Sequence, residues 1–130
     1  GFMNNPGDLK YTKDHEWVRA DGDTVTVGIT DYAQGELGDV VFVELPEVGA
    51  SVEAGKAFGV VESVKAVSDV YAPLTGTIEE INDDLIDAPE IINTSPYEDG
   101  WMVKIRMADA GDADDLMDAE AYQALIAEES

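Results

Sequence analysis

Short apolar segments that favour strands follow one another through most of this 130-residue chain, separated by glycine, proline or aspartate. Asp21-Gly22-Asp23, between two such segments, is a strong hairpin signal, and Pro46 ends another segment. The expected strands are residues 16–20, 24–29, 40–45, 58–61, 67–71, 77–81 and 101–107. This pattern predicts a mainly β protein, a sandwich or flattened barrel of antiparallel sheets.

Helical signals interrupt the pattern twice. Thr30 and Asp31 are suited to begin a short helix over residues 32–37, which Gly38 would end. Residues 40–45 are nearly all apolar, which is typical of a buried strand, and residues 82–100 are expected to be mostly loop.

The C-terminal segment has helical rather than strand periodicity. Its apolar residues recur at helical spacing: Leu116, Ala119, Tyr122 and Ile126. Three aspartates crowd the expected N-terminal end, where the helix dipole favours negative charge: Asp112, Asp114 and Asp115. We expect a C-terminal α-helix packed on the sheets, with these carboxylates solvated rather than binding calcium.

Composition narrows the possible functions. The chain is long enough for one domain with a modest core, and no apolar run approaches the roughly 20 residues of a membrane-spanning helix. With no cysteine it has no thiol chemistry of its own. A formal net charge of −22 argues against nucleic acid or an anionic membrane as partner. The acidic surface suits enzymes with basic docking faces, although solubility or a salty cytoplasm would explain it equally well.

Lys65, one of five lysines, stands between two strand-type segments, residues 58–61 and 67–71. Gly55 and Gly76 flank it almost symmetrically and mark where each arm enters and leaves its sheet. Lys65 is therefore expected near a hairpin tip. For an arbitrary lysine between strands, a solvated charge is the usual interpretation.

The residues around Lys65 and four further blocks resemble the glycine cleavage H-protein family. The blocks are residues 10–18, 27–34, 37–46 and 95–102, and they extend the resemblance over nearly the whole chain. It implies a lipoyl-type β-sandwich of two antiparallel sheets in a single domain over residues 9–130, after an N-terminal extension of residues 1–8. It also implies that (R)-lipoate is covalently bound to Lys65.

The same resemblance implies a shuttle with no catalytic residues of its own. Glycine decarboxylase (the P protein) would load an aminomethyl group, and aminomethyltransferase (the T protein) would remove it. Dihydrolipoamide dehydrogenase (the L protein) would reoxidise the arm, after a lipoate ligase or lipoyl transferase had attached it. By the same resemblance, Glu16 and Asp69 line a cleft for the loaded arm, and the protein is a monomer. Proximity and charge suggest that Glu62 contacts the ligase or the decarboxylase.

Other interpretations remain open on the sequence. A biotin carrier usually has methionines beside its lysine, where Val64 and Ala66 stand here, and lipoyl domains of 2-oxo acid dehydrogenases lack the block around His15. A non-carrier acidic interaction module is a third class. A Schiff-base role for Lys65 is disfavoured because nearby carboxylates favour its charged form. We expect no metal site, and a structural or surface role for His15.

The N-terminal residues suggest a location. We interpret Gly1 and Phe2, before Met3, as residues added ahead of the natural start, and no signal-peptide pattern follows them. The bacterial cytoplasm is the expected location, although a mitochondrial matrix protein would look the same once its transit peptide was removed.

Overall fold

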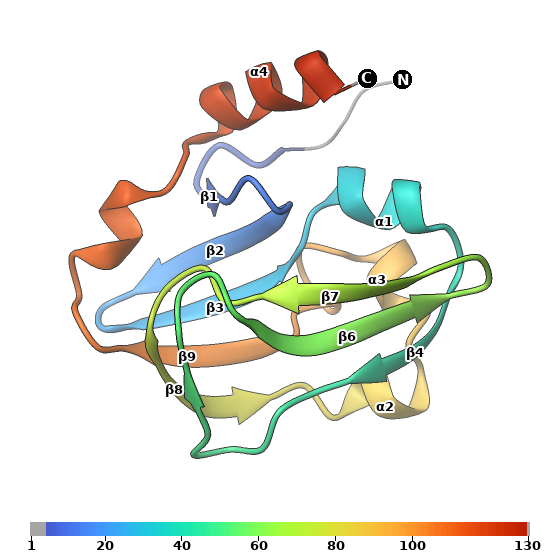
Figure 1. Cartoon of the computed structure of the whole chain (residues 1–130), viewed down its shortest axis with the longest axis horizontal. Coiled ribbons are helices and arrows are strands. Elements are labelled where there is room, and N and C mark those ends of the chain that lie inside the picture. The colour runs from blue at the N-terminus through green and yellow to red at the C-terminus, as the bar shows by residue number, and fades with distance from the viewer. Residues whose placement is uncertain (1–4, 130) are drawn as a thin grey trace.

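The structure is a computed structural model that describes residues 5–129, and two antiparallel sheets dominate it (Figure 1). The strands are β1 (Lys10–Tyr11), β2 (Glu16–Asp21), β3 (Thr24–Ile29), β4 (Val40–Glu44), β5 (Ser51–Val52), β6 (Ala57–Ser63), β7 (Val67–Tyr71), β8 (Gly76–Ile81) and β9 (Val103–Met107). The helices are α1 (Asp31–Leu37), α2 (Asp84–Asp87), α3 (Ile91–Thr94) and α4 (Ala119–Glu129), with a 3-10 turn η1 (Asp112–Asp115). The interpretation of residues 1–3 concerns positions outside the described range.

One sheet has the strand order β1-β2-β3-β9-β8-β5 and the other β4-β6-β7. Buried aliphatic side chains from both sheets share one core, including Val27, Ile105, Val61 and Val70. The predicted mainly β, two-sheet architecture is confirmed. Gly76 begins β8 where a Cβ atom would lie 2.1 Å from the Arg106 carbonyl oxygen, so a side chain there would prevent β8 from pairing with β9.

The expected hairpin around Gly22 and the expected helix after Thr30 are both present. β2 and β3 pair with Asp21 opposite Thr24. The Thr30 side chain caps α1 by accepting a hydrogen bond from the Ala33 N–H, at 3.2 Å. Gly38, with φ of 83°, ends the helix.

One expectation for the middle of the chain is wrong, and a second needs an addition. β4 is not a buried strand, since it lies at a sheet edge and a bulge turns Val41 and Phe42 outward, each about half exposed. Residues 82–100 are mostly loop, as expected, although the two short helices α2 and α3 lie within them. Burial of Leu85 and Ile92, rather than a helical sequence pattern, stabilises these short helices.

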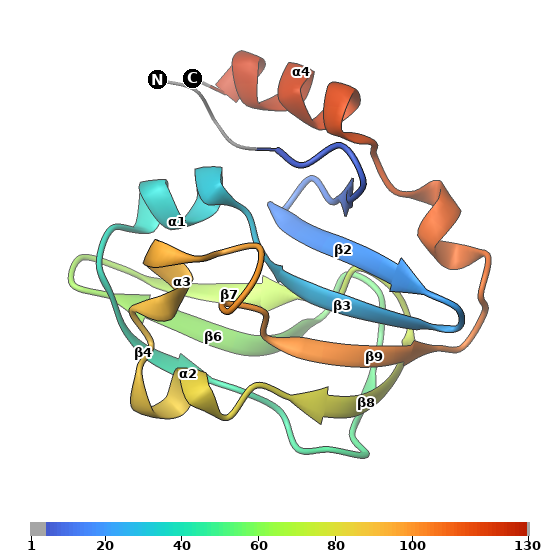
Figure 2. The same cartoon turned by 180° about the vertical axis from the view of Figure 1, so that it is seen from behind.

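The C-terminal helix is confirmed, but its start was misplaced. The three aspartates belong to η1, and α4 begins only at Ala119, after Asp118 accepts a hydrogen bond from the Ala121 N–H at 2.8 Å. α4 lies along the β1 edge of the larger sheet (Figure 2), where the Tyr122 ring stacks on Tyr11 with centroids 4.6 Å apart. None of the helices within residues 5–129 combines the length and apolarity needed to cross a bilayer.

Candidate functional site

Lys65 lies at the exposed tip of the β6–β7 hairpin. The strands pair up to Glu62 opposite Val67, which leaves four residues for the turn. Ser63 organises this turn: its N–H donates to the Ala66 carbonyl at 2.8 Å, and its Oγ accepts from the N–H groups of Lys65 and Ala66 at 3.3 and 3.1 Å. A serine hydroxyl bound to nearby backbone is a known turn device, so Ser63 was recognisable in the sequence but was missed.

The tip is fixed to the loop that follows α1. The Val64 N–H donates to the Asp39 carbonyl oxygen at 3.0 Å. Gly38 lies beneath the Lys65 side chain, where a Cβ atom would be 3.6 Å from Lys65 Cε. Asn93 holds this loop by accepting from the Val40 N–H and donating to the Gly38 carbonyl, at 2.8 and 2.9 Å. The backbone of the tip is therefore positioned although the Lys65 amine is in solvent.

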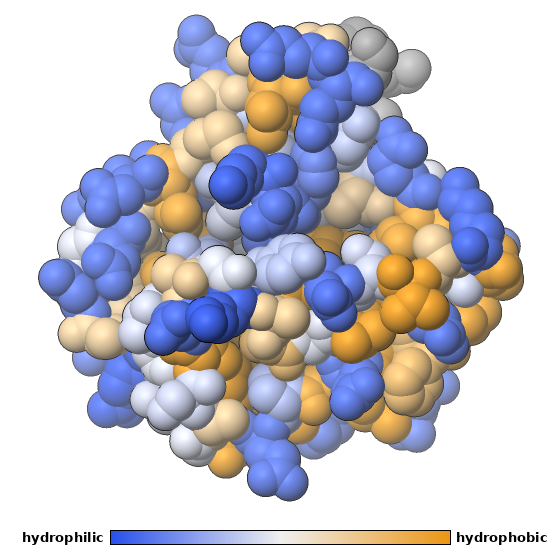
Figure 3. All heavy atoms as spheres, viewed as in Figure 1, coloured by the Kyte–Doolittle hydropathy of each residue, from blue (hydrophilic) through white to orange (hydrophobic). Residues whose placement is uncertain are grey.

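A cleft of about 540 Å³ lies beside β7, between the two sheets and α1. In the space-filling view the surface is hollowed in this region, with apolar residues in the hollow (Figure 3). Its aliphatic lining consists of Ile29, Ala33, Leu37, Val61 and Val70. Five carboxylates also line it: Asp14, Glu16, Glu36, Asp69 and Glu129. Such a cleft suits a ligand with an apolar chain and a cationic end.

Backbone geometry at His15 brings three consecutive residues to this cleft. Neighbouring residues of an extended strand point to opposite sides, yet Asp14, His15 and Glu16 all line the cavity. His15 has φ of 70°, an uncommon conformation for a residue with a side chain. The Thr30 N–H donates to the His15 carbonyl at 3.0 Å and supports this turn.

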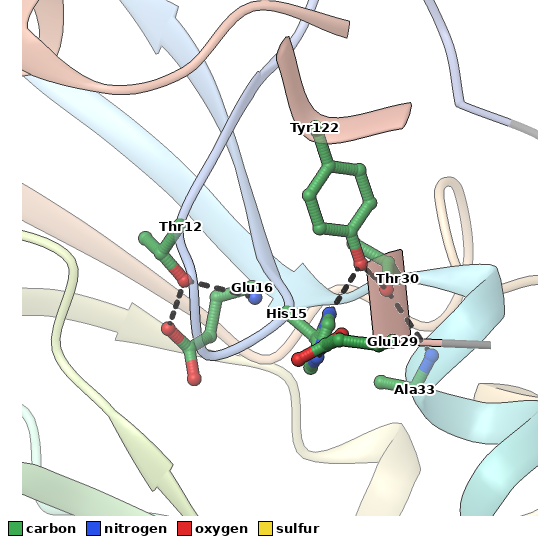
Figure 4. Close-up of polar contacts among 7 residues, drawn as sticks. All are labelled: Thr12, His15, Glu16, Thr30, Ala33, Tyr122 and Glu129. Carbon is green, nitrogen blue, oxygen red and sulfur yellow. Dashed lines mark hydrogen bonds and ion pairs between the residues drawn. The ribbon is translucent and has the colours of Figure 1, made fainter. Parts of the chain in front are cut away.

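Glu16 is buried, with 2% of its surface exposed. Its Oε1 accepts from the Thr12 hydroxyl at 2.5 Å (Figure 4). Its Oε2 accepts from the Tyr71 N–H at 3.3 Å. Because β7 is an edge strand, its free N–H groups can reach the other sheet, and this second bond joins the two sheets. Burial raises the pKa of Glu16 to about 7, against the opposing effect of the two hydrogen bonds. The carboxyl group can therefore change charge near neutral pH.

The predicted site residues separate into two places. Glu16 and Asp69 lie together in the cleft, Glu16 buried and Asp69 exposed on β7. Lys65 and Glu62 do not line the cleft and lie at and below the tip. The cleft carboxylates Asp14, Glu36 and Glu129 were not predicted, because no local pattern indicates that they meet.

His15 has the structural role that was expected, through a set of polar contacts. Its Nδ1 lies 2.8 Å from the Tyr122 hydroxyl, and its Nε2 lies 3.0 Å from Glu129 Oε2 (Figure 4). The arrangement has the order of an acid–base triad, but the Tyr122 hydroxyl cannot attack a substrate because Tyr122 is fully buried. No group of three or more metal-ligating side chains occurs within residues 5–129.

Comparisons with known proteins agree over nearly the whole chain. The family model described as glycine cleavage H-protein matches residues 9–129. The glycine cleavage system H protein of Staphylococcus carnosus is 57% identical over 126 residues, which cover 97% of this chain and 100% of that protein. The corresponding protein of Geobacillus kaustophilus is also 57% identical, over 97% of this chain and 99% of its own length.

Comparison of structures leads to the same family. A crystal structure of a glycine cleavage system H protein from Mycobacterium marinum superposes with a TM-score of 0.87 at 43% identity. The match covers 94% of this chain and 98% of that one.

Proposed function

Because the chain belongs to the glycine cleavage H-protein family, we propose that Lys65 is the residue that bears its lipoyl group. Proteins of this family are the non-catalytic lipoyl carriers of the aminomethyl group in glycine cleavage, and this is the function of the chain. The exposed position of Lys65 on an ordered tip is the observation that carries the assignment.

The residues around Lys65 fit such a group. An enzyme can reach the amine without unfolding the hairpin, while Ser63 and Asp39 hold the turn in one conformation. Gly38 leaves the lysine side chain free to lie over the end of α1, toward Leu37 at the cleft. When bound, the lipoyl group supplies a reducible disulfide on a flexible chain, which this cysteine-free protein otherwise lacks.

We propose that Glu16 and Asp69 hold the cationic end of the loaded arm. Asp69 on β7 is four residues from Lys65, a separation of at most roughly 13 Å for an extended chain, which is within reach of a long side-chain conjugate. Carboxylates there can accept charge-assisted hydrogen bonds from an amine, and Val61 and Val70 limit the access of water. The cleft should bind the loaded arm more tightly than the empty arm, since an uncharged arm gains no interaction with the carboxylates.

The partners are the components of the glycine cleavage system. We propose that these are the P, T and L proteins, and that a lipoate ligase or lipoyl transferase recognises Glu62 beside the tip. The charge of −22 supports steering toward basic docking faces. Because the relatives are bacterial proteins, we propose that the chain acts in the bacterial cytoplasm. Membership of the family supports the proposal that it is a monomer.

Lipoylation followed by peptide mapping tests the attachment site. Incubation with a lipoate ligase and lipoate should modify Lys65 only, and Lys65→Arg should fold normally yet gain no mass. Lys56→Arg is the matched control, because Lys56, just before β6, is also well exposed. Lipoate on another lysine, or shuttle activity in Lys65→Arg, would contradict the assignment. A wild-type chain that accepts no lipoate would favour the interaction-module alternative.

A further inference from the structure

We propose that His15 is a positioning residue that holds the C-terminal end of α4 at the cleft, so that Glu129 forms part of the wall around the loaded arm. The inference rests on the proposed docking of the arm in the cleft. It gives α4 a functional role beyond covering the β1 edge.

The contacts of His15 span two turns of α4. Tyr122 and Glu129 are seven residues apart, which places them on the same face of the helix. One ring nitrogen contacts the Tyr122 hydroxyl at 2.8 Å, and the other contacts the Glu129 carboxylate at 3.0 Å. A single side chain from the cleft thus holds both the middle and the end of the helix (Figure 4).

The hydrogen bonds that join Thr30 to Glu129 through Tyr122 and His15 can all be donated in the same direction along the series. The Ala33 N–H donates to Thr30 Oγ1 at 3.2 Å, and Thr30 Oγ1 lies 2.7 Å from the Tyr122 hydroxyl. If Thr30 donates to Tyr122 and Tyr122 donates to His15 Nδ1, each hydroxyl group both donates and accepts. His15 Nε2–H then donates to Glu129, the acceptor at the end of the series. This order connects the start of α1, which is one wall of the cleft, to the last turn of α4.

The position of Glu129 separates this role from simple stabilisation. Tyr122 is fully buried and stacks on Tyr11, so the middle of α4 is anchored without Glu129. Glu129 adds little to that anchor, because 39% of its side chain is exposed. It does line the cleft, as do His15 and the residues on either side of it, Asp14 and Glu16. The contact therefore determines the position of this part of the cleft wall more than the stability of the fold.

A matched pair of variants tests the proposal. Glu129→Ala removes the contact, whereas Glu128→Ala makes the same substitution at an exposed neighbour that does not line the cleft. Amide hydrogen exchange of unmodified protein gives the first readout: the last turn of α4 should exchange about threefold faster in Glu129→Ala only. Ammonia loss from the loaded carrier, without T protein, gives the second and should also be about threefold faster in Glu129→Ala.

Two further variants make the outcome decisive. Glu129→Gln keeps an acceptor for His15 and should recover most of the wild-type lifetime. Asp69→Ala tests the cleft itself. A short lifetime in Asp69→Ala with a wild-type lifetime in Glu129→Ala would overturn the role of α4 and leave the proposed function intact. Wild-type lifetimes in both would overturn docking in the cleft altogether.

Discussion

The hairpin tip and the cleft differ in how the chain builds them. Four consecutive residues, Ser63 to Ala66, form the tip, and one serine hydroxyl organises it. The cleft is assembled from β2, β3, α1, β6, β7 and α4, and its buried carboxyl group is held by Thr12 and Tyr71 from different parts of the sequence. The tip is a local structure that presents a group, and the cleft is a tertiary structure that encloses one.

This difference shows how one small domain meets two opposed requirements. Attachment to Lys65 needs exposure, because the modifying enzyme must reach the amine. Shelter of a reactive cationic group needs burial and carboxylates, which the tip does not have. Loading and shelter should therefore respond to different substitutions.

The largest expected effect on stability comes from the buried carboxyl group of the cleft. The pKa of Glu16 is raised from its ordinary value of 4.5 to about 7, so between these values the folded state binds a proton that the unfolded state releases. Stability from this group is present in acid and is lost as the pH rises toward about 7. The free energy of unfolding of Glu16→Gln relative to wild type should thus rise by up to about 3 kcal/mol from about pH 4 to about pH 8.

Urea denaturation of both proteins across this range measures the effect. A constant offset is expected in addition, because glutamine cannot accept from the Tyr71 N–H with its amide nitrogen. The raised pKa is tested only by how the difference in free energy of unfolding between the two proteins varies with pH. A difference that is flat across the range would show that Glu16 does not titrate near neutrality.

Ser63→Ala should affect the tip alone. Loss of the hydroxyl removes the acceptor for the Lys65 and Ala66 N–H groups, and should cost about 1 kcal/mol because water can replace it in part. Ligase-catalysed lipoylation should slow by several-fold, as the turn samples other conformations. The lifetime of the loaded carrier should equal that of wild type. Exposed Ser51 provides the control, since Ser51→Ala should alter neither quantity; a shortened lifetime in Ser63→Ala would break the separation.

Salt should produce the smallest effect, and it should act mainly on the rate at which the chain associates with the P protein. Raising ionic strength should slow association with the P protein by roughly threefold to tenfold, because the acidic surface steers the partners over distances that salt screens. Stopped-flow association rates at several salt concentrations measure this. The lifetime of the loaded carrier should change less, since Glu16 is buried. An association rate independent of salt would assign the charge to solubility alone.

The same local and tertiary distinction explains what the sequence could predict. Three features depend only on residues that are neighbours in the sequence, and all three were predicted from those residues. They are the β2–β3 hairpin, the capped start of α1 and the tip at Lys65. Glu129 was missed because its position depends on how α4 packs, and helical spacing does not reveal that. The start of α4 was misplaced for a similar reason: η1 holds the aspartates, while the helix begins where Asp118 caps it.

Resemblance to a family supplied what spacing could not. It paired Glu16 with Asp69, which are 53 positions apart, and both do line one cleft. It did not indicate the raised pKa of Glu16, which results from burial beneath Thr12 and β7. The exposure of Val41 and Phe42 was also beyond reach, because a bulge in an edge strand leaves no clear signature in an apolar run.

The lifetime of the loaded carrier tests most directly whether loading and shelter are separate. Lipoylated wild type, Glu16→Ala and Asp69→Ala would be loaded with glycine and the P protein, and ammonia release followed with no T protein present. Both variants should accept lipoate at the wild-type rate and lose ammonia about tenfold faster, because a charge-assisted hydrogen bond to the amine is removed. Glu62→Ala, altered near the tip, should instead keep the wild-type lifetime. Equal lifetimes in all four proteins would contradict the account.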